Sequence, residues 1–227
     1  MSGQPLVALV GGEEFTEAAE AFDRELLALV EAEAPNIAIL PTAAKSENPF
    51  LAAAHGISHF RKLGADPYGV MIVDKITADA PVLVAELAGA EIVYLTGGNP
   101  SNLLEGLHDS RAWQKLLEMA DDGTVIAGSS AGAMVLGERM AFDGEETEAL
   151  GLVAGVIVLP HFERTDAARI EQLVQAAPEG MTYVGIDGAT GCLRVNDEWK
   201  VTGPGHVQLI TRAGAEVVES GGVFRLP

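Results

Sequence analysis

The chain has 227 residues, 48% of them hydrophobic and 21% charged, which is typical of a globular protein rather than a disordered one. Asp and Glu outnumber Lys and Arg by 33 to 14, and the resulting net charge of −19 disfavours nucleic acid and anionic membranes as partners. Because Cys192 is the single cysteine and no apolar run reaches the roughly 18 residues that span a bilayer, we expect a reduced, cytoplasmic protein.

Short apolar runs alternate with helical patterns over most of the chain. Strands are predicted at 6–10, 36–40, 68–73, 91–96, 124–127 and 155–159. Helices are predicted between or after them, with starts near Ala19, Asn48, Asp79, Ser110 and Thr165. This alternation, with short connections, is the pattern of a parallel sheet that is covered by helices on both faces.

The rhythm changes after about Thr182, where shorter strands follow one another. They are predicted at 192–196, 199–202 and 207–211. We therefore predict an α/β fold of three layers: a mostly parallel central sheet, helices on both faces, and a small antiparallel C-terminal edge. The whole chain, residues 1–227, is expected to form one domain.

Ligands of such folds bind beyond the carboxyl ends of the parallel strands. Five polar or glycine-rich segments stand at predicted strand ends, and we expect them to converge on one rim. They are 11–13, 41–43, 97–99, 128–130 and 160–162.

The segment Gly128–Gly132, GSSAG, matches the G-x-S-x-G pattern of a nucleophile elbow, with Ser130 at the centre. Small neighbours allow a tight turn from strand to helix with the serine hydroxyl projecting outward. The amide of Ala131 then lies at a helix N-terminus, where it can stabilise an oxyanion. A turn built for close packing or phosphate binding is the alternative interpretation.

A serine nucleophile needs a general base within hydrogen-bond reach. His161 follows an apolar strand directly at its carboxyl end, which makes it the candidate base for Ser130. The other histidines fall on predicted helices or turns: His55, His59, His108 and His206.

An acid is needed in turn to orient the histidine. An acidic segment lies between Ser130 and His161 and offers four carboxylates, which the residues alone do not separate. They are Asp143, Glu145, Glu146 and Glu148. A solvated run of charges is the alternative interpretation for most of them.

Four motifs together resemble the dipeptidase E and cyanophycinase family of serine peptidases, in the same order along most of the chain. They are YLTGGN at 94–99, GSSAGA at 128–133, LPHF at 159–162 and VGIDGAT at 184–190. The resemblance implies a three-layer α/β fold related to class I glutamine amidotransferases. It also implies hydrolysis of peptide or isopeptide bonds next to aspartate, through serine, histidine and an acid.

Carried over residue by residue, the resemblance makes Ser130 the nucleophile and His161 the base. It places the oxyanion hole at the amides of Gly98 and Ala131. The family acid lies about 15 to 18 residues after the serine, and Glu145 is our first choice there. Glu148, Glu146 and Asp143 follow it.

The resemblance also implies residues that hold the substrate. They are Asn99 in the GGN turn, and Arg164 and Arg169 after the histidine. Arg169, on the helix that Thr165 opens, is the better clamp for a substrate carboxylate, because a guanidinium can bind it through two hydrogen bonds.

The sequence thus predicts a serine peptidase that hydrolyses small peptides through an acyl-enzyme, without cofactor or metal. A homodimer is an option that the sequence leaves open. A ligand-binding member of the fold that has lost catalysis is one alternative. An α/β-hydrolase esterase is another, but the 31 positions between Ser130 and His161 are too few for that fold.

Overall fold

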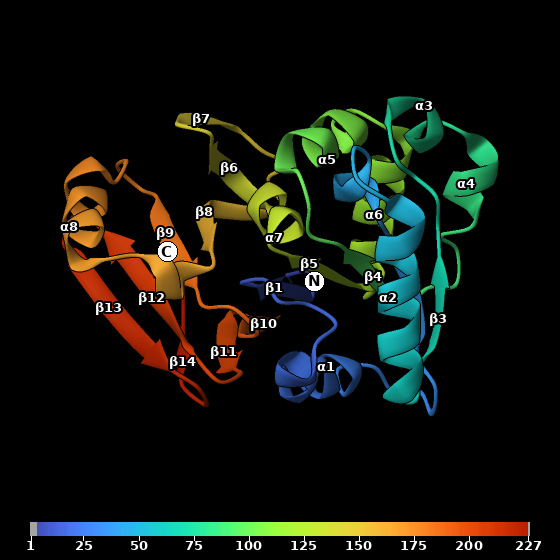
Figure 1. The fold of residues 1–227 in the computed structure, drawn as a ribbon, viewed down its shortest axis with the longest axis horizontal. Coiled ribbons are helices and arrows are strands. Elements are labelled where there is room, and N and C mark those ends of the chain that lie inside the picture. Colours follow the sequence, from blue (N-terminus) through green and yellow to red (C-terminus); the bar gives the residue numbers. More distant parts are fainter. Residues whose placement is uncertain (1–3, 227) are drawn as a thin grey trace.

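The computed structural model describes residues 4–226, which form two β-sheets and the helices around them (Figure 1). The first sheet has eight strands in the order β14-β11-β10-β1-β5-β4-β2-β3, among the described residues. The second has six, in the order β13-β12-β9-β8-β6-β7. Helix α7 lies between the two sheets in this view.

The first sheet has a parallel centre and an antiparallel edge. Its parallel strands are β1 (Val7–Val10), β2 (Asn36–Leu40), β3 (Asp66–Gly69), β4 (Ile92–Leu95) and β5 (Val125–Ser129). Its antiparallel strands are β10 (Gly191–Val195), β11 (Glu198–Thr202) and β14 (Val223–Phe224). Strands β1, β4 and β5 are buried along their whole length, as continuous apolar runs in a covered sheet are.

Helices cover both faces of the first sheet. One face carries α1 (Glu20–Leu27) and α2 (Pro49–Lys62), whose Phe22, Leu26 and Phe60 pack in one apolar core. The other face carries α5 (Pro100–Leu107), α6 (Arg111–Asp121) and α7 (Ala131–Leu136). The remaining short helices are η1 (Glu17–Ala19), η2 (Thr42–Ala44), α3 (Lys75–Ala78), α4 (Pro81–Ala85) and η3 (Phe162–Arg164).

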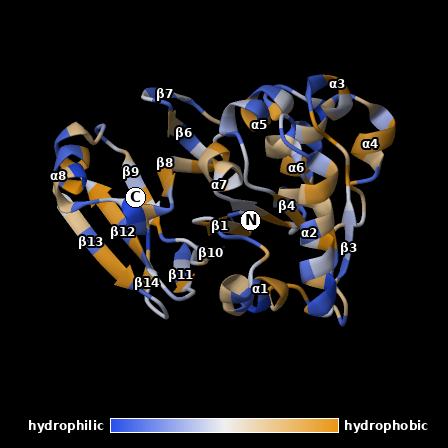
Figure 2. Ribbon diagram, viewed as in Figure 1, coloured by the Kyte–Doolittle hydropathy of each residue, from blue (hydrophilic) through white to orange (hydrophobic). Residues whose placement is uncertain are grey.

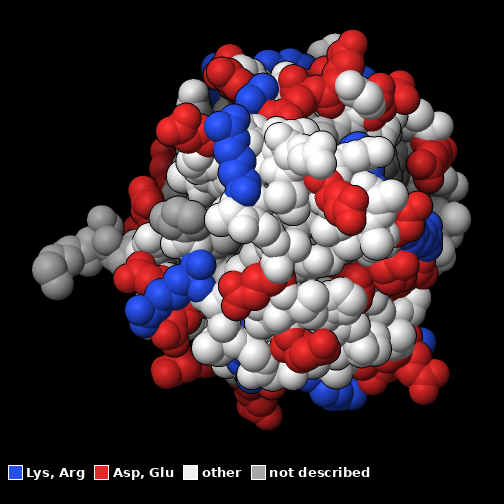
Figure 3. All heavy atoms as spheres, turned by 90° about the vertical axis from the view of Figure 1, so that its left-hand side faces the viewer, with Lys and Arg blue, Asp and Glu red and all other residues white. Residues whose placement is uncertain are grey.

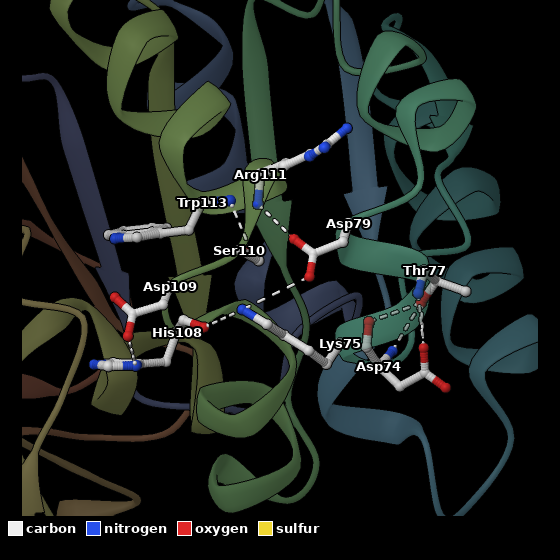
Figure 4. A network of polar contacts seen from close by, with 9 residues as sticks. All are labelled: Asp74, Lys75, Thr77, Asp79, His108, Asp109, Ser110, Arg111 and Trp113. Carbon is white, nitrogen blue, oxygen red and sulfur yellow. Dashed lines mark hydrogen bonds and ion pairs between the residues drawn. The ribbon is translucent and has the colours of Figure 1, made fainter.

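Polar side chains join α3 and the residue that follows it to the connection between α5 and α6 (Figure 4). The Nζ of Lys75 donates to the carbonyl oxygen of His108 over 2.7 Å, and the N–H of Arg111 donates to the carboxylate of Asp79 over 2.9 Å. Ser110 caps α6. These bonds satisfy backbone groups that helix ends leave without partners.

The second sheet combines three parallel strands with antiparallel neighbours. Its strands are β6 (Gly137–Phe142), β7 (Glu145–Glu148), β8 (Val153–Pro160), β9 (Thr182–Ile186), β12 (His206–Thr211) and β13 (Gly214–Glu219). Strands β6, β8 and β9 run parallel. Helix α8 (Ala167–Ala176) packs on this sheet through a separate apolar core.

The predicted α/β class, with a largely parallel sheet and antiparallel edge strands, is confirmed. The division into two sheets was not predicted: β8 and β12, expected beside the central sheet, belong to the second. The third strand also differs, since it covers Asp66–Gly69 instead of 68–73. One domain over residues 1–227 stays a prediction, because its ends lie outside the described residues.

Hydrophobic residues are prominent on strands such as β8, β12 and β13 and on parts of the helices (Figure 2). The face that Figure 3 shows, on the side of β13 and α8, carries scattered Asp and Glu with few Lys and Arg between uncharged areas. This distribution agrees with the net charge of −19. Over residues 4–226, no helix has both the length and the apolar character that crossing a membrane requires.

Candidate active site

Ser130 stands alone between the end of β5 and the start of α7, in a backbone conformation with φ 47° and ψ −109°. A non-glycine residue held in such a sparsely populated region costs of order 1–3 kcal/mol, and such residues cluster at functional sites. The neighbouring backbones approach closely, because a Cβ on Gly128 would lie 2.5 Å from the carbonyl of Gly132. The small residues of GSSAG are therefore required by the turn.

His161 follows β8 and also has a left-handed backbone, with φ 52° and ψ 40°. Its N–H donates to the carbonyl oxygen of Gly11 over 2.8 Å. Its ring lies against Gly12, where an added Cβ would be 2.2 Å from Cε1. The Nε2 of His161 is 3.5 Å from the Oγ of Ser130. The structure thus brings these two residues together, at the long separation common in catalytic sites without substrate.

The Nδ1 of His161 is buried and has no hydrogen-bond partner among residues 4–226. The predicted acid Glu145 is exposed on β7, and no hydrogen bond or ion pair joins it to His161 within that range. Glu146 instead pairs with Arg139 over 2.8 Å. Asp143 and Glu148 are exposed as well, so the structure pairs none of the four predicted acids with the histidine.

Two backbone amides stand beside the serine without acceptors. Neither the N–H of Gly98 nor that of Ala131 donates a hydrogen bond within the part of the chain that the structure describes. Ala131 is the first residue of α7, so its amide points out of a helix N-terminus. Gly98 borders both cavities that open next to Ser130 and His161. These amides have the chemistry of oxyanion donors.

Two cavities of different character meet at Ser130, His161 and Gly98. The first, of about 530 Å³, is bordered by Glu14, Phe15, Glu47, His55 and Thr96, among others. The second, of about 370 Å³, is bordered by Met134, Phe142, Leu159, Phe162 and Arg169, among others. The first cavity therefore carries the acidic residues Glu14 and Glu47. The second is mainly apolar and carries Arg169.

The predicted substrate-binding residues fall in different places. The Oδ1 of Asn99 accepts from the N–H groups at 101 and 102, so this side chain caps α5. Arg164 is exposed and pairs with Glu13 and Glu163, each over 3.2 Å. Arg169 is the one that borders a cavity next to Ser130.

Glu14 is a site residue that the sequence reasoning missed. Its Oε1 accepts from the N–H of Gly97 over 2.8 Å, and its Oε2 accepts from the hydroxyl of Ser129 over 2.9 Å. Its signal in the sequence is its place just beyond the end of β1, next to the segment 11–13 at a predicted strand end.

Comparisons with known proteins agree on one class. A peptidase from an acI-B1 Actinobacterium has a similar structure, with a TM-score of 0.85 and 25% identity over 99% of this chain and 98% of that one. A putative peptidase E protein from Listeria monocytogenes shares the fold, with a TM-score of 0.65 and 19% identity over 88% and 98% of the two chains. The chain therefore has the fold of a class of α/β proteins that includes these solved peptidase structures.

The chain belongs to peptidase family S51, which matches residues 6–201. A cyanophycinase from Nostoc sp. is 30% identical over 189 residues, which are 77% of this chain and 62% of the relative. One from Synechococcus elongatus is 28% identical over 213 residues, 84% and 65% of the two chains. The family predicted from the four motifs is thereby confirmed. The chain spans a little under two thirds of the length of these cyanophycinases.

Proposed function

We propose that this protein is a serine peptidase that hydrolyses small peptides through a covalent acyl-enzyme. The observation that carries the proposal is the 3.5 Å separation between the Oγ of Ser130 and the Nε2 of His161, with two free amides beside them. Membership of peptidase family S51 supports it.

In the proposed reaction, the Nε2 of His161 takes the hydroxyl proton as the Oγ of Ser130 attacks the scissile carbonyl carbon. The carbonyl oxygen becomes an oxyanion that the N–H groups of Gly98 and Ala131 stabilise. His161 then gives its proton to the leaving amine, and an ester on Ser130 remains. Water, deprotonated by the same imidazole, releases the acid and restores the serine.

The strained backbone of Ser130 and the bond from His161 to Gly11 hold the reacting side chains in place. For the acid of the triad we keep Glu145 as first candidate. The hairpin that carries it borders the apolar cavity through Ala141 and Phe142. If one carboxylate of this hairpin orients His161, the single neutral replacements at Asp143, Glu145, Glu146 and Glu148 will give one dominant loss of kcat.

The charge of the two cavities supports a preference for an acidic substrate. Arg169 is at the rim of the apolar cavity, where its guanidinium can bind a carboxylate through two hydrogen bonds. The other cavity has no Lys or Arg among the described residues that border it. We therefore propose that an aspartate side chain next to the scissile bond is held on the Arg169 side.

Digestion of a defined peptide library, read by mass spectrometry, tests this function. The wild-type chain should cleave peptides beside aspartate, and Ser130→Ala should cleave none. Cleavage that survives in Ser130→Ala would remove the serine from the mechanism. No cleavage by either protein would favour the alternative that the chain binds ligands without turning them over.

A further inference from the structure

The loop that follows β1, residues 11–15, contacts the three segments that carry Ser130, His161 and Gly98. The carbonyl oxygen of Gly11 accepts from the N–H of His161, and the carboxylate of Glu14 accepts from Gly97 and Ser129. The bond to His161 joins this loop to the strand end of the second sheet that carries the histidine, and the bonds of Glu14 join it to two strand ends of the first sheet.

The two bonds of Glu14 end on the immediate neighbours of two proposed catalytic groups. Gly97 precedes Gly98, the oxyanion donor, and Ser129 precedes Ser130. Each carboxylate oxygen therefore holds one strand end, β4 through Gly97 and β5 through Ser129. Hydrogen bonds to an ionised acceptor are about twice as strong as neutral ones, so a carboxylate suits this bridge.

The local backbone is shaped to place Glu14 in this position. Glu13 and Phe15, on either side of it, both have left-handed backbones, with φ of 57° and 63°. Phe15 anchors the loop by packing on Tyr94 and Phe60, with ring centroids 5.2 and 6.0 Å away. Residues with a side chain rarely adopt this region, so the surrounding contacts must enforce the conformation.

Gly97, which faces the carboxylate of Glu14, leaves room for it because it has no side chain. A Cβ on Gly97 would lie 2.5 Å from the Oε1 of Glu14, so the carboxylate occupies the space that a side chain would fill. Ser129 is fully buried, so water cannot replace the carboxylate as the partner of its hydroxyl without opening the turn.

We propose that Glu14 is a positioning residue that fixes the amide of Gly98 and the hydroxyl of Ser130 relative to one another. This inference rests on the proposed function. Glu14 acts through Gly97 and Ser129 rather than on the substrate. Oxyanion donors must lie about 2.7–3.1 Å from the developing charge, and a misplacement of about 1 Å can cost 10²-fold in rate.

The test compares Glu14→Ala and Glu14→Gln with Glu47→Ala on a cleaved peptide. Glu47 is the matched control: it borders the same cavity, is exposed, and makes no side-chain hydrogen bond or ion pair among the described residues. Glu14→Ala should lower kcat by about 10²-fold and leave KM within about threefold, because catalytic geometry is lost and binding is kept. Glu47→Ala should behave like the wild type.

Glu14→Gln should have a kcat much closer to that of the wild type than Glu14→Ala has. Its amide oxygen can accept from the N–H of Gly97 and its NH₂ group can donate to the hydroxyl oxygen of Ser129. If Glu14→Ala does not fold, as judged by circular dichroism, Ser129→Ala takes its place. That variant removes one of the two bonds and should lower kcat by about tenfold.

Wild-type kcat in Glu14→Ala, or a higher KM with unchanged kcat, would overturn the proposal, as would full kcat in Ser129→Ala. A wild-type chain without peptidase activity would contradict the proposed function instead. The same variants are then compared by the rate at which a fluorophosphonate modifies Ser130. Equal rates in wild type and Glu14→Ala, or no modification at all, would overturn the role of Glu14.

Discussion

At the scale of single residues, His161 and the glycine under its ring show how closely the proposed catalytic pair is packed. Gly12 has φ 116°, and its missing side chain leaves the space in which the imidazole lies. The ring packs against Gly12, and its Nε2 lies near the Oγ of Ser130. A methyl group on Gly12 would meet the ring itself.

Gly12→Ala should therefore displace His161 and lower kcat. The loss of kcat should be much larger than in a glycine variant that loses a similar unfolding free energy. Gly64→Ala is a suitable control, because Gly64 has a similar φ of 98° but nothing within 4 Å of an added Cβ. Both variants should lose about 1 kcal/mol or more of unfolding free energy, since alanine disfavours positive φ. Peptidase assays with urea unfolding separate the two effects. Equal kcat in the two variants would show that the ring is not positioned by Gly12.

The sequence predicted Ser130 and His161, which stand at strand ends. It did not predict Glu14, whose carboxylate bonds to two neighbouring strand ends. Ser130 and His161 could be identified because each follows a buried apolar run, and parallel strands bring such ends together. Glu14 could not, because a carboxylate in an acidic chain has no distinguishing pattern. Its role depends on a left-handed turn at Glu13 that places the side chain inward.

At the scale of elements, a buried pair of titratable side chains, Asp23 and His59, joins α1 to α2 and makes stability depend on pH. The Oδ2 of Asp23 on α1 is 2.7 Å from the Nε2 of His59 on α2, and both side chains are buried. Burial raises the pKa of Asp23 above its ordinary value, although the hydrogen bond and charge of His59 act in the opposite direction. The folded state therefore holds the Asp23 proton more tightly than the unfolded chain does.

Because the folded pKa of Asp23 is the higher one, its contribution to stability is present below the ordinary carboxyl pKa, about 4, and is lost as the pH rises through the folded value. Asp23→Asn cannot ionise and can still accept from His59. The unfolding free energy of the variant relative to wild type should rise with pH above about 4. Urea unfolding at several pH values measures this, and a difference that stays constant with pH would contradict it.

The hairpin of β6 and β7 shows why some elements escaped prediction. The run from Asp143 to Glu148 reads as a solvated acidic loop, yet Asp143 and Gly144 form the turn of a hairpin, with φ of 55° and 82°. Asp-Gly is a recognised hairpin signal. The high charge concealed it, because strand propensity is weak where the strand is exposed on both faces.

For the whole molecule, the decisive feature is that the site lies where the two sheets meet. The first sheet supplies Ser130 and Gly98, and the second supplies His161. The bonds from His161 to Gly11 and from Ala189 to Gly12, each 2.8 Å, join the two sheets at that point. Periodicity identified most of the individual strands, but it does not specify which of them pair across long stretches of chain.

The predictions of a cytoplasmic location, of no nucleic-acid or membrane partner, and of a homodimer as an option stay predictions from sequence. The net charge of −19 agrees with weak binding of the chain to polyanions, and the face in Figure 3 carries more Asp and Glu than Lys and Arg.

Mass spectrometry of the intact protein after reaction with a fluorophosphonate tests the central claim most directly. The account predicts one adduct per wild-type chain, located on Ser130 by peptide mapping, and none in Ser130→Ala. His161→Ala should react at least about 10²-fold more slowly, because it lacks the base. An adduct on another residue, or a wild-type rate in His161→Ala, would contradict the pairing of this serine with this histidine.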